Sequence, residues 1–347
     1  MAPLGVGAGR SVALRCFSAP VHSMMKYDAR GAPKDHPNGI ADRAERTSPA
    51  PNVAPGTQAV RSAAPVPQFF KRLLLTYLLP YLLPHRQRSL IWQFARRDVL
   101  ARYRGSLLGL SWSFLTPLLM LGIYTFVFRE VFNARWPASA QGGSLGDGNV
   151  EFALQVYAGL IVFNLFAEVM ARAPRLVLDQ PNLVKKVVFP LEILPWVAIL
   201  AGIFHLVINL AVLLTATLVT RGSLPPTLVA LPLIIAAFLP LLLGFSWLLA
   251  ALGVFLRDIG QLIGMVMTAL MFLSPVFYPA EALPKRWQPL LSFNPMTLPI
   301  EQLRRVMLDG LWPNWDSLAL YAAAALLIGW LGAGWFAATR KGFADVL

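Results

Sequence analysis

The chain has 347 residues, of which 56% are hydrophobic and only 14% are charged, and its mean hydropathy is +0.58. This composition excludes an ordinary soluble domain and predicts a membrane protein with several spans. The net charge of +13 would suit a nucleic-acid partner. The basic residues, however, are scattered between apolar stretches and match no nucleic-acid-binding module, so we expect no nucleic acid.

The first 68 residues differ from the rest of the chain. They are rich in Ala, Pro, Gly and Ser and lack hydrophobic periodicity, which predicts a disordered extension over residues 1–68. The apolar run at residues 12–14 is ended by Arg15, too early for the core of a signal peptide. Translation from Met24 or Met25 is an open hypothesis. One cysteine, Cys16, excludes an internal disulfide and offers no metal cluster, so no metal is expected.

Residues 69–104 are predicted to form interface helices on the cytoplasmic face of the membrane. Pro80 and Pro84 interrupt the first apolar run, which is too short to span. Residues 89–104 combine apolar positions with arginines at helical spacing, as in an amphipathic helix at headgroup depth. Such a surface attracts either anionic lipids or a cytosolic partner, and both alternatives stay open.

The remainder, residues 105–347, is predicted to be an all-α polytopic domain of about six transmembrane helices. A hydrocarbon core of about 30 Å requires roughly 20 apolar residues per helix. Such stretches begin near Leu107, Phe152, Pro195, Thr227, Gln261 and Ser317. Lysines and arginines cluster before the first span and after the second, fourth and sixth. The positive-inside rule therefore places both termini and residues 171–190 in the cytoplasm.

A second unusual segment lies between the fifth and sixth spans. Six prolines in residues 274–307 forbid one long helix, and the apolar content forbids a free loop. We expect short re-entrant helices at the outer face, which act either as a structural plug or as a gate at the exit of a path.

From about Ile91 to Lys341 the chain resembles the membrane-spanning subunits of ABC-2 exporters of lipid-linked polysaccharide, namely the O-antigen, capsule and teichoic acid exporters. The motifs that carry the resemblance, in order, are residues 97–98, 102–103, Gly109, Trp112, Pro117, 126–128, 157–160, 183–190, 194–195, 257–258, 274–279, 294–296, Glu301 and Arg304. The extension before Phe69 departs from the family pattern. So do residues 162–164, where the family more often has an aromatic residue, commonly Trp.

The resemblance implies the permease subunit of an ATP-driven exporter of undecaprenyl-diphosphate-linked, O-antigen-like polysaccharide in the bacterial inner membrane. The sequence has no G-x-x-x-x-G-K-[ST] motif, so this chain is not expected to bind nucleotide or to be an enzyme. The resemblance implies instead two copies of a cytosolic ABC ATPase, which hold ATP and Mg²⁺. It also implies a second copy of the permease, with the channel between the copies. Glycines at 105 and 109, or at 329, 332 and 334, would allow close helix approach either between copies or within one chain.

The resemblance further implies four groups of functional residues. The first is a cytoplasmic gate that contacts the substrate diphosphate: Lys185, Lys186, Phe189 and Pro190. A lysine pair suits a diphosphate, although the lysines would also simply satisfy the charge rule. The second is the ATPase-docking surface: Arg97, Asp98, Arg102, Arg257 and Asp258. For Arg257 and Asp258 the alternative is a local salt bridge or a turn cap.

The third group consists of aromatic residues that line the path, since flat rings stack on sugars: Trp112, Tyr124, Phe128, Tyr157, Phe163 and Phe166. Their alternatives are interface belts and bundle core. The fourth is a periplasmic gate: Tyr278, Asn294, Glu301 and Arg304.

Polar residues inside the predicted spans are few. His205 and Asn209 are expected to make hydrogen bonds between helices rather than a proton relay. Two other functions stay open, an ABC-2 exporter of a small molecule or drug and a membrane glycosyl or acyl transferase. The transferase would need paired acidic residues at the membrane face, for which only Glu168 and Asp179 are candidates.

Overall fold

The computed structural model describes residues 84–131, 148–185 and 189–347, and in these ranges it contains helices and no strands. The predicted extension at 1–68, the run at 69–83 and Lys186 lie outside the described residues. Five helical segments are long and apolar enough to cross a membrane: Gly109–Phe126, Val150–Arg175, Leu191–Arg221, Pro226–Phe255 and Trp315–Val346. A further apolar helix, α9 (Ile259–Leu273), is shorter and lies where the fifth span was predicted. The predicted all-α polytopic fold is confirmed.

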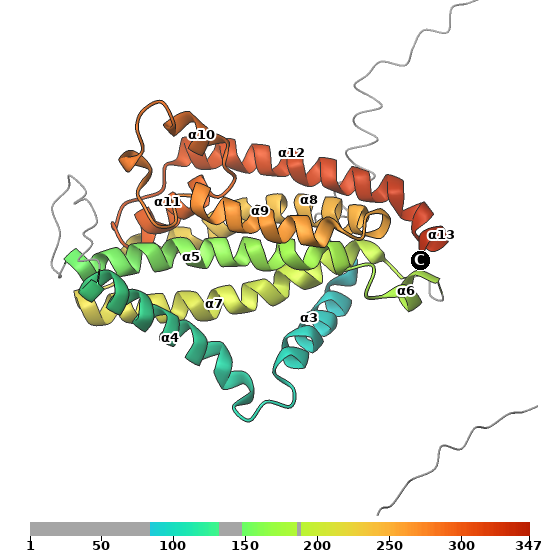
Figure 1. Ribbon diagram of the computed structural model, residues 1–347, viewed down its shortest axis with the longest axis horizontal. Helices are drawn as coiled ribbons and strands as arrows, with labels where there is room; N and C mark the ends of the chain where they lie inside the picture. The colour runs from blue at the N-terminus through green and yellow to red at the C-terminus, as the bar shows by residue number, and fades with distance from the viewer. Residues whose placement is uncertain (1–83, 132–147, 186–188) are drawn as a thin grey trace, which may run out of the picture. The chain divides into compact units, whose positions relative to one another are not determined.

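The remaining helices follow the chain order shown in Figure 1. Their bounds are α3 (Arg88–Tyr103), α4 (Trp112–Phe126), α5 (Gly148–Arg172), α6 (Pro181–Lys185), α7 (Leu194–Arg221), α8 (Leu231–Phe255), α10 (Gln288–Phe293), α11 (Thr297–Met307), α12 (Trp315–Thr339) and α13 (Phe343–Val346). Helix α4 continues into a π-helical turn at Val127–Val131. The proline-rich segment forms the short helices α10 and α11, as predicted, and Pro295 lies in the break between them.

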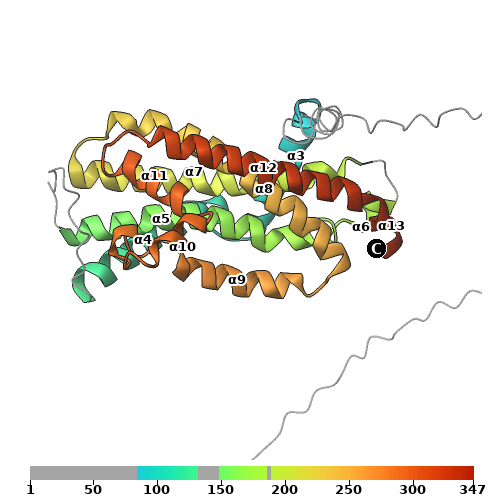
Figure 2. The same cartoon turned by 90° about the horizontal axis from the view of Figure 1, so that it is seen from above.

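Helix α5 is the centre of the bundle, whereas α4 is its least covered span. Helix α5 packs against α4, α7, α8, α9 and α11, and Figures 1 and 2 both show it beside α7. Of the residues in its most apolar stretch, 72% are buried, compared with 11% in α4. The core therefore forms around α5, and α4 leaves most of its apolar surface uncovered by the described chain.

Helices α8 and α12 touch at the level of their backbones. A Cβ atom on Gly332 would lie 2.1 Å from the carbonyl oxygen of Gly244, and one on Gly329 would lie 2.9 Å from that of Pro240. Both views show the two helices side by side (Figures 1 and 2). Gly329 and Gly332 thus serve close packing within one chain, the second of the predicted alternatives. Gly334 instead faces open space.

The two ends of the bundle gather different segments. At one end, called here the α6 end, α13 contacts α6 and α8, and the 3₁₀ turn Ala173–Arg175 packs against α8 and α9 (Figure 1). At the other, the α11 end, Thr227 donates a hydrogen bond of 2.7 Å to the carbonyl oxygen of Val306. The carboxyl terminus, residues 171–185 and the α8–α9 turn thus lie together, as the charge distribution predicted.

We expect Gly332→Ala to destabilise the protein, because the added methyl group would overlap the backbone of Gly244. The cost of such overpacking is on the order of 1–3 kcal/mol. The matched control is Gly334→Ala on the same helix, where nothing lies within 4 Å of the new atom. Thermal unfolding in detergent measures the difference, and an equal shift in both variants would contradict the backbone contact.

Candidate functional site

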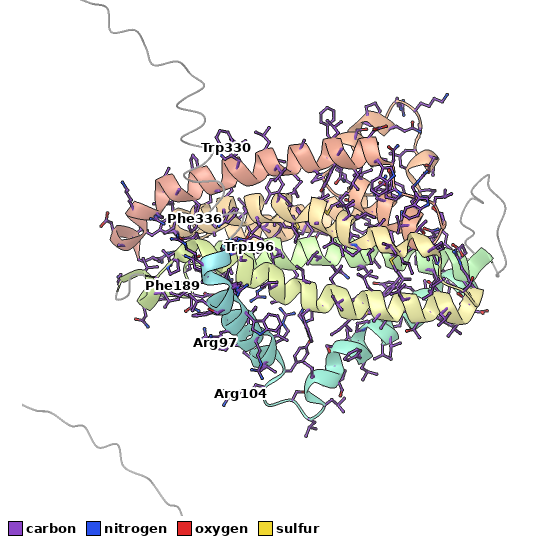
Figure 3. The ribbon with its side chains drawn as sticks, turned by 180° about the vertical axis from the view of Figure 1, so that it is seen from behind. Arg97, Arg104, Phe189, Trp196, Trp330 and Phe336 are labelled. Atoms are coloured by element: carbon purple, nitrogen blue, oxygen red, sulfur yellow. The ribbon has the colours of Figure 1, made fainter. Side chains whose placement is uncertain are left out.

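The inward face of α3 packs on the beginning of α7 and on the predicted gate segment. Ile91 and Ala95 are buried against Ile193 and Val197. The ring of Phe94 lies 5.5 Å from that of Phe189, centroid to centroid. Figure 3 shows Phe189 beside the N-terminal half of α3. This apolar contact fixes one half of the helix and brings the predicted gate residue Phe189 to α3.

The other half of α3 is held by charges. Arg102 donates a hydrogen bond of 2.6 Å from Nη2 to Oε1 of Glu168 on α5, and Asp98 forms an ion pair with Arg172, also on α5. The second carboxylate oxygen of Glu168 lies 3.2 Å from Nδ1 of His205 on α7. We call Asp98, Arg102, Glu168, Arg172 and His205 the α3 network. It connects α3 to two membrane spans.

Two further bonds extend the polar contacts along α7. The hydroxyl of Tyr103 lies 3.1 Å from Nε2 of His205, and the hydroxyl of Tyr157 donates a bond of 2.9 Å to Asn209. His205 and Asn209 each bond to α5, which confirms the predicted hydrogen bonds between helices.

The α3 network adds a structural role to two predicted docking residues. Asp98 and Arg102 were expected on a surface offered to the ATPase, and both side chains bond to α5 while staying partly exposed. They attach α3 to the bundle. The sequence did not reveal this, because the partners of Arg102 lie 66 and 103 residues away along the chain.

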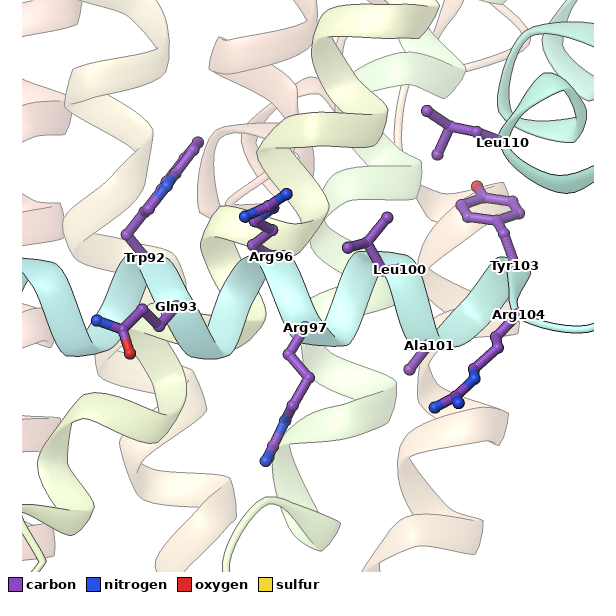
Figure 4. A pocket seen from close by; sticks show the side chains of 9 residues that line it. All are labelled: Trp92, Gln93, Arg96, Arg97, Leu100, Ala101, Tyr103, Arg104 and Leu110. Carbon is purple, nitrogen blue, oxygen red and sulfur yellow. The ribbon is translucent and has the colours of Figure 1, made fainter.

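The third predicted docking residue on α3, Arg97, lies on the outward face. Its guanidinium group stands 4.6 Å from the ring centre of Phe94. This face borders a groove of about 710 Å³. Figure 4 shows Trp92, Arg96 and Leu100 on one edge of the face and Arg97 and Arg104 on the other. Within the described residues Arg96 and Arg104 make no ion pair, so the outward face carries free positive charge.

The remaining predicted residues at the α6 end differ in exposure. Arg257 and Asp258 occupy the turn between α8 and α9, and neither side chain bonds to another described residue. Within the described residues, Arg257 and Asp258 therefore form neither the local salt bridge nor the side-chain cap that were the alternatives to docking. Lys185 is exposed at the end of α6, while Phe189 and Pro190 are half-buried.

The predicted path-lining aromatics divide into two sets. Tyr157, Phe163 and Phe166 are at most 4% exposed and belong to the core of the single chain, so their predicted role is corrected to core packing. Trp112 on α4 is 40% exposed, and Tyr124 and Phe128 are half-buried. The sequence alone does not distinguish an aromatic residue that packs in the core of the bundle from one that lines a path.

At the α11 end, the predicted gate residue Arg304 is buried and clamps the surrounding backbone. Its guanidinium group donates to the carbonyl oxygens of Gln155 (2.8 Å), Pro275 (2.6 Å) and Val276 (2.6 Å). Gly159 leaves the space it needs, because a Cβ there would lie 2.7 Å from Nη2 of Arg304. The three bonds join the re-entrant segment to α5.

Two more predicted gate residues are also structural. Asn294 donates to Oγ of Ser274 at 3.0 Å and accepts from the backbone nitrogen of Met296 at 2.9 Å. Tyr278 donates to the carbonyl oxygen of Phe272 at 3.2 Å. These bonds hold the turns around α10.

Glu301 differs from the other three gate residues, because its carboxylate bonds to no other described residue. It borders a cavity of about 230 Å³ together with Glu281. Burial, followed by the nearby charge of Glu281, raises the pKa of Glu301 to about 7, although Arg304 opposes the shift. The Glu301 carboxyl group therefore takes up a proton more readily than an exposed glutamate. The gate role of the four residues stays a prediction, and Glu301 is the one whose side chain makes no hydrogen bond within the described residues.

Comparison with known proteins places this arrangement in one family. The family model described as ABC-2 type transporter matches residues 89–308, more than half of the chain. The O-antigen export system permease protein RfbA of Myxococcus xanthus is 25% identical over 264 residues, covering 75% of this chain and 96% of that protein. A protein of the same name from Klebsiella pneumoniae is 22% identical over 277 residues, covering 79% and 99%.

We expect Arg304→Gln to destabilise the protein by on the order of 3 kcal/mol, because buried carbonyl groups would lose their donors. The control is Arg305→Gln, one position along α11, whose exposed side chain donates to the carbonyl oxygen of Trp312. That change should cost about 1 kcal/mol or less. Denaturation in detergent distinguishes the two variants, and similar losses would show that Arg304 is not a clamp.

Proposed function

The chain belongs to the ABC-2 type transporter family, and we propose that it is the permease subunit that exports an O-antigen-like polysaccharide across the bacterial inner membrane. The proposal is carried by relatives named O-antigen export permeases, which this chain matches over 95–99% of their length. The all-α fold with membrane-length helices supports the same reading.

In this proposal the energy comes from a separate ABC ATPase, as the family implies. Two ATPase copies hold ATP and Mg²⁺ and dock on the cytoplasmic side, which we assign to the α6 end. The exposed outward face of α3, with Arg96, Arg97 and Arg104, and the exposed Arg257 and Asp258 support this assignment. Free charges at a membrane surface suit a partner with complementary charge.

The path forms between two copies of the permease. The support is the uncovered apolar surface of α4 and α9, where side chains such as Phe114, Phe126, Met265 and Phe272 are 49–71% exposed. Trp112 on α4 belongs to the same uncovered helix. Lys185, with its neighbour Lys186, would meet the diphosphate of the lipid carrier at the entrance.

The transferase alternative loses its main candidate. Glu168, which was a possible catalytic carboxylate, is bonded to Arg102 and His205. Both carboxylate oxygens are thus engaged, so a catalytic role would require one of these bonds to break. No observation favours the export of a small molecule over that of a glycan.

Deletion of the gene tests the proposed export. We expect surface polysaccharide to disappear and lipid-linked polymer to accumulate on the cytoplasmic side, with both effects reversed by a plasmid copy. Surface extraction and analysis of the lipid-linked pool measure the two quantities. Unchanged surface glycan together with new drug sensitivity would replace the proposal by small-molecule export.

A charge reversal tests the docking surface. Arg257→Glu should lower co-purification of the ATPase several-fold, because an exposed positive charge at the contact is inverted. The matched control is Lys285→Glu, an exposed cation in the loop before α10 at the α11 end, which should leave co-purification unchanged. Equal binding by wild type and the Arg257 variant would exclude this turn from the docking surface.

A further inference from the structure

The four charged residues of the α3 network other than His205 stand at matching positions on their helices. Asp98 and Arg102 are four residues apart on α3, and Glu168 and Arg172 are four residues apart on α5. Residues at this spacing are neighbours on one helix face, and an acid followed by a base is the favourable order. The four charges therefore have two complete sets of pairs.

The first set is the one seen in the structure, and it runs between helices. Arg102 pairs with Glu168 and Arg172 pairs with Asp98. The second set runs within helices, with Asp98 to Arg102 on α3 and Glu168 to Arg172 on α5. Each set satisfies every charge, so neither leaves an unpaired ion at a membrane span, which would be costly.

The second set is already partly formed. Nη1 of Arg172 lies 3.9 Å from Oε1 of Glu168. The same Nη1 atom is buried and has no hydrogen-bond partner among the described residues. His205 also stays beside Glu168 on α7. If Arg102 moved away, Glu168 would keep two partners, and Arg172 would need only a small shift.

The connection between α3 and α4 permits such a movement. Gly105 and Gly109 both adopt the left-handed backbone conformation, with φ of +85° and +50°. Nothing lies within 4 Å of the position that a side chain would occupy on either residue. A linker with two open glycines lets α3 move without carrying α4 with it.

We propose that Asp98, Arg102, Glu168 and Arg172 form an ion-pair exchange switch. Pairs between helices hold α3 on the bundle, and pairs within helices replace them when α3 is displaced. The inference rests on the proposed function in one respect, since the ATPase that docks on the outward face of α3 supplies the displacement. The switch lowers the free-energy cost of that displacement, because every charge stays paired, and it transmits the displacement to α5 and α7.

Charge exchange within one helix tests the switch. In Glu168→Arg with Arg172→Glu, the pairs within α5 survive but both pairs between helices become repulsive, so α3 should be released. Asp98→Arg with Arg102→Asp should release it in the same way. The four changes together restore both sets of pairs, and α3 should return.

The measurement is the distance between spin labels at exposed Arg104 and Lys341, in the full chain with Cys16→Ser, reconstituted in lipid nanodiscs. We expect the distance distribution to shift in each double variant and to return to that of wild type in the quadruple variant. The control exchanges Glu192 and Arg340, an ion pair at 3.3 Å outside the network, and should leave the distribution unchanged. Thermal unfolding confirms that each variant is folded.

An unchanged distribution in folded double variants would overturn the switch, as would a folded quadruple variant that still resembles the doubles. Glycan export by the same variants gives a separate readout, lost in the doubles and regained in the quadruple. If wild type exported no glycan while the distances behaved as expected, the proposed function would fail and the switch would stand.

Discussion

A membrane interior offers no water, so each backbone carbonyl that leaves a helix there needs a donor from the protein. Several side chains meet this constraint, and Arg304 meets most of it, because it donates to the carbonyl groups of Pro275 and Val276 and to that of Gln155. The position of α11, the path of the proline-rich segment and the small residue at Gly159 all depend on this contact. The backbone of the α11 end is consequently held in place by the guanidinium group of Arg304.

The α6 end is organised by a different principle, because its charges have more than one way to pair. Helix α5 connects the two ends, since it carries Gln155 and Gly159 near the clamp and Glu168 and Arg172 in the α3 network. A helix buried along most of its length behaves as a rigid rod. The clamp and the α3 network are thus attached to one and the same helix.

Hydropathy and proline content are local properties, and for this reason they predicted the spans, their starting points and the broken segment before α12. Pairing is not local. From the sequence, Asp98 and Arg102 were predicted to be surface charges without partners in the chain, because nothing in their own sequence neighbourhood indicates partners on α5. Tyr157 and Phe163 were assigned to a path for a similar reason, since an aromatic side chain in a span does not reveal which way its helix faces.

The contact between Pro174 and α8 has a geometric consequence for the segment that follows. A Cβ on Gly253 would lie 2.0 Å from the carbonyl oxygen of Pro174, so the two backbones touch and the turn Ala173–Arg175 is anchored there. Lys185 follows Arg175 by ten positions (185 − 175 = 10), and the helix α6 on which it stands packs Leu183 and Val184 against the core and contacts α13. Lys185 is thus an exposed charge whose backbone is attached to the bundle both at the turn before it and at α6 itself.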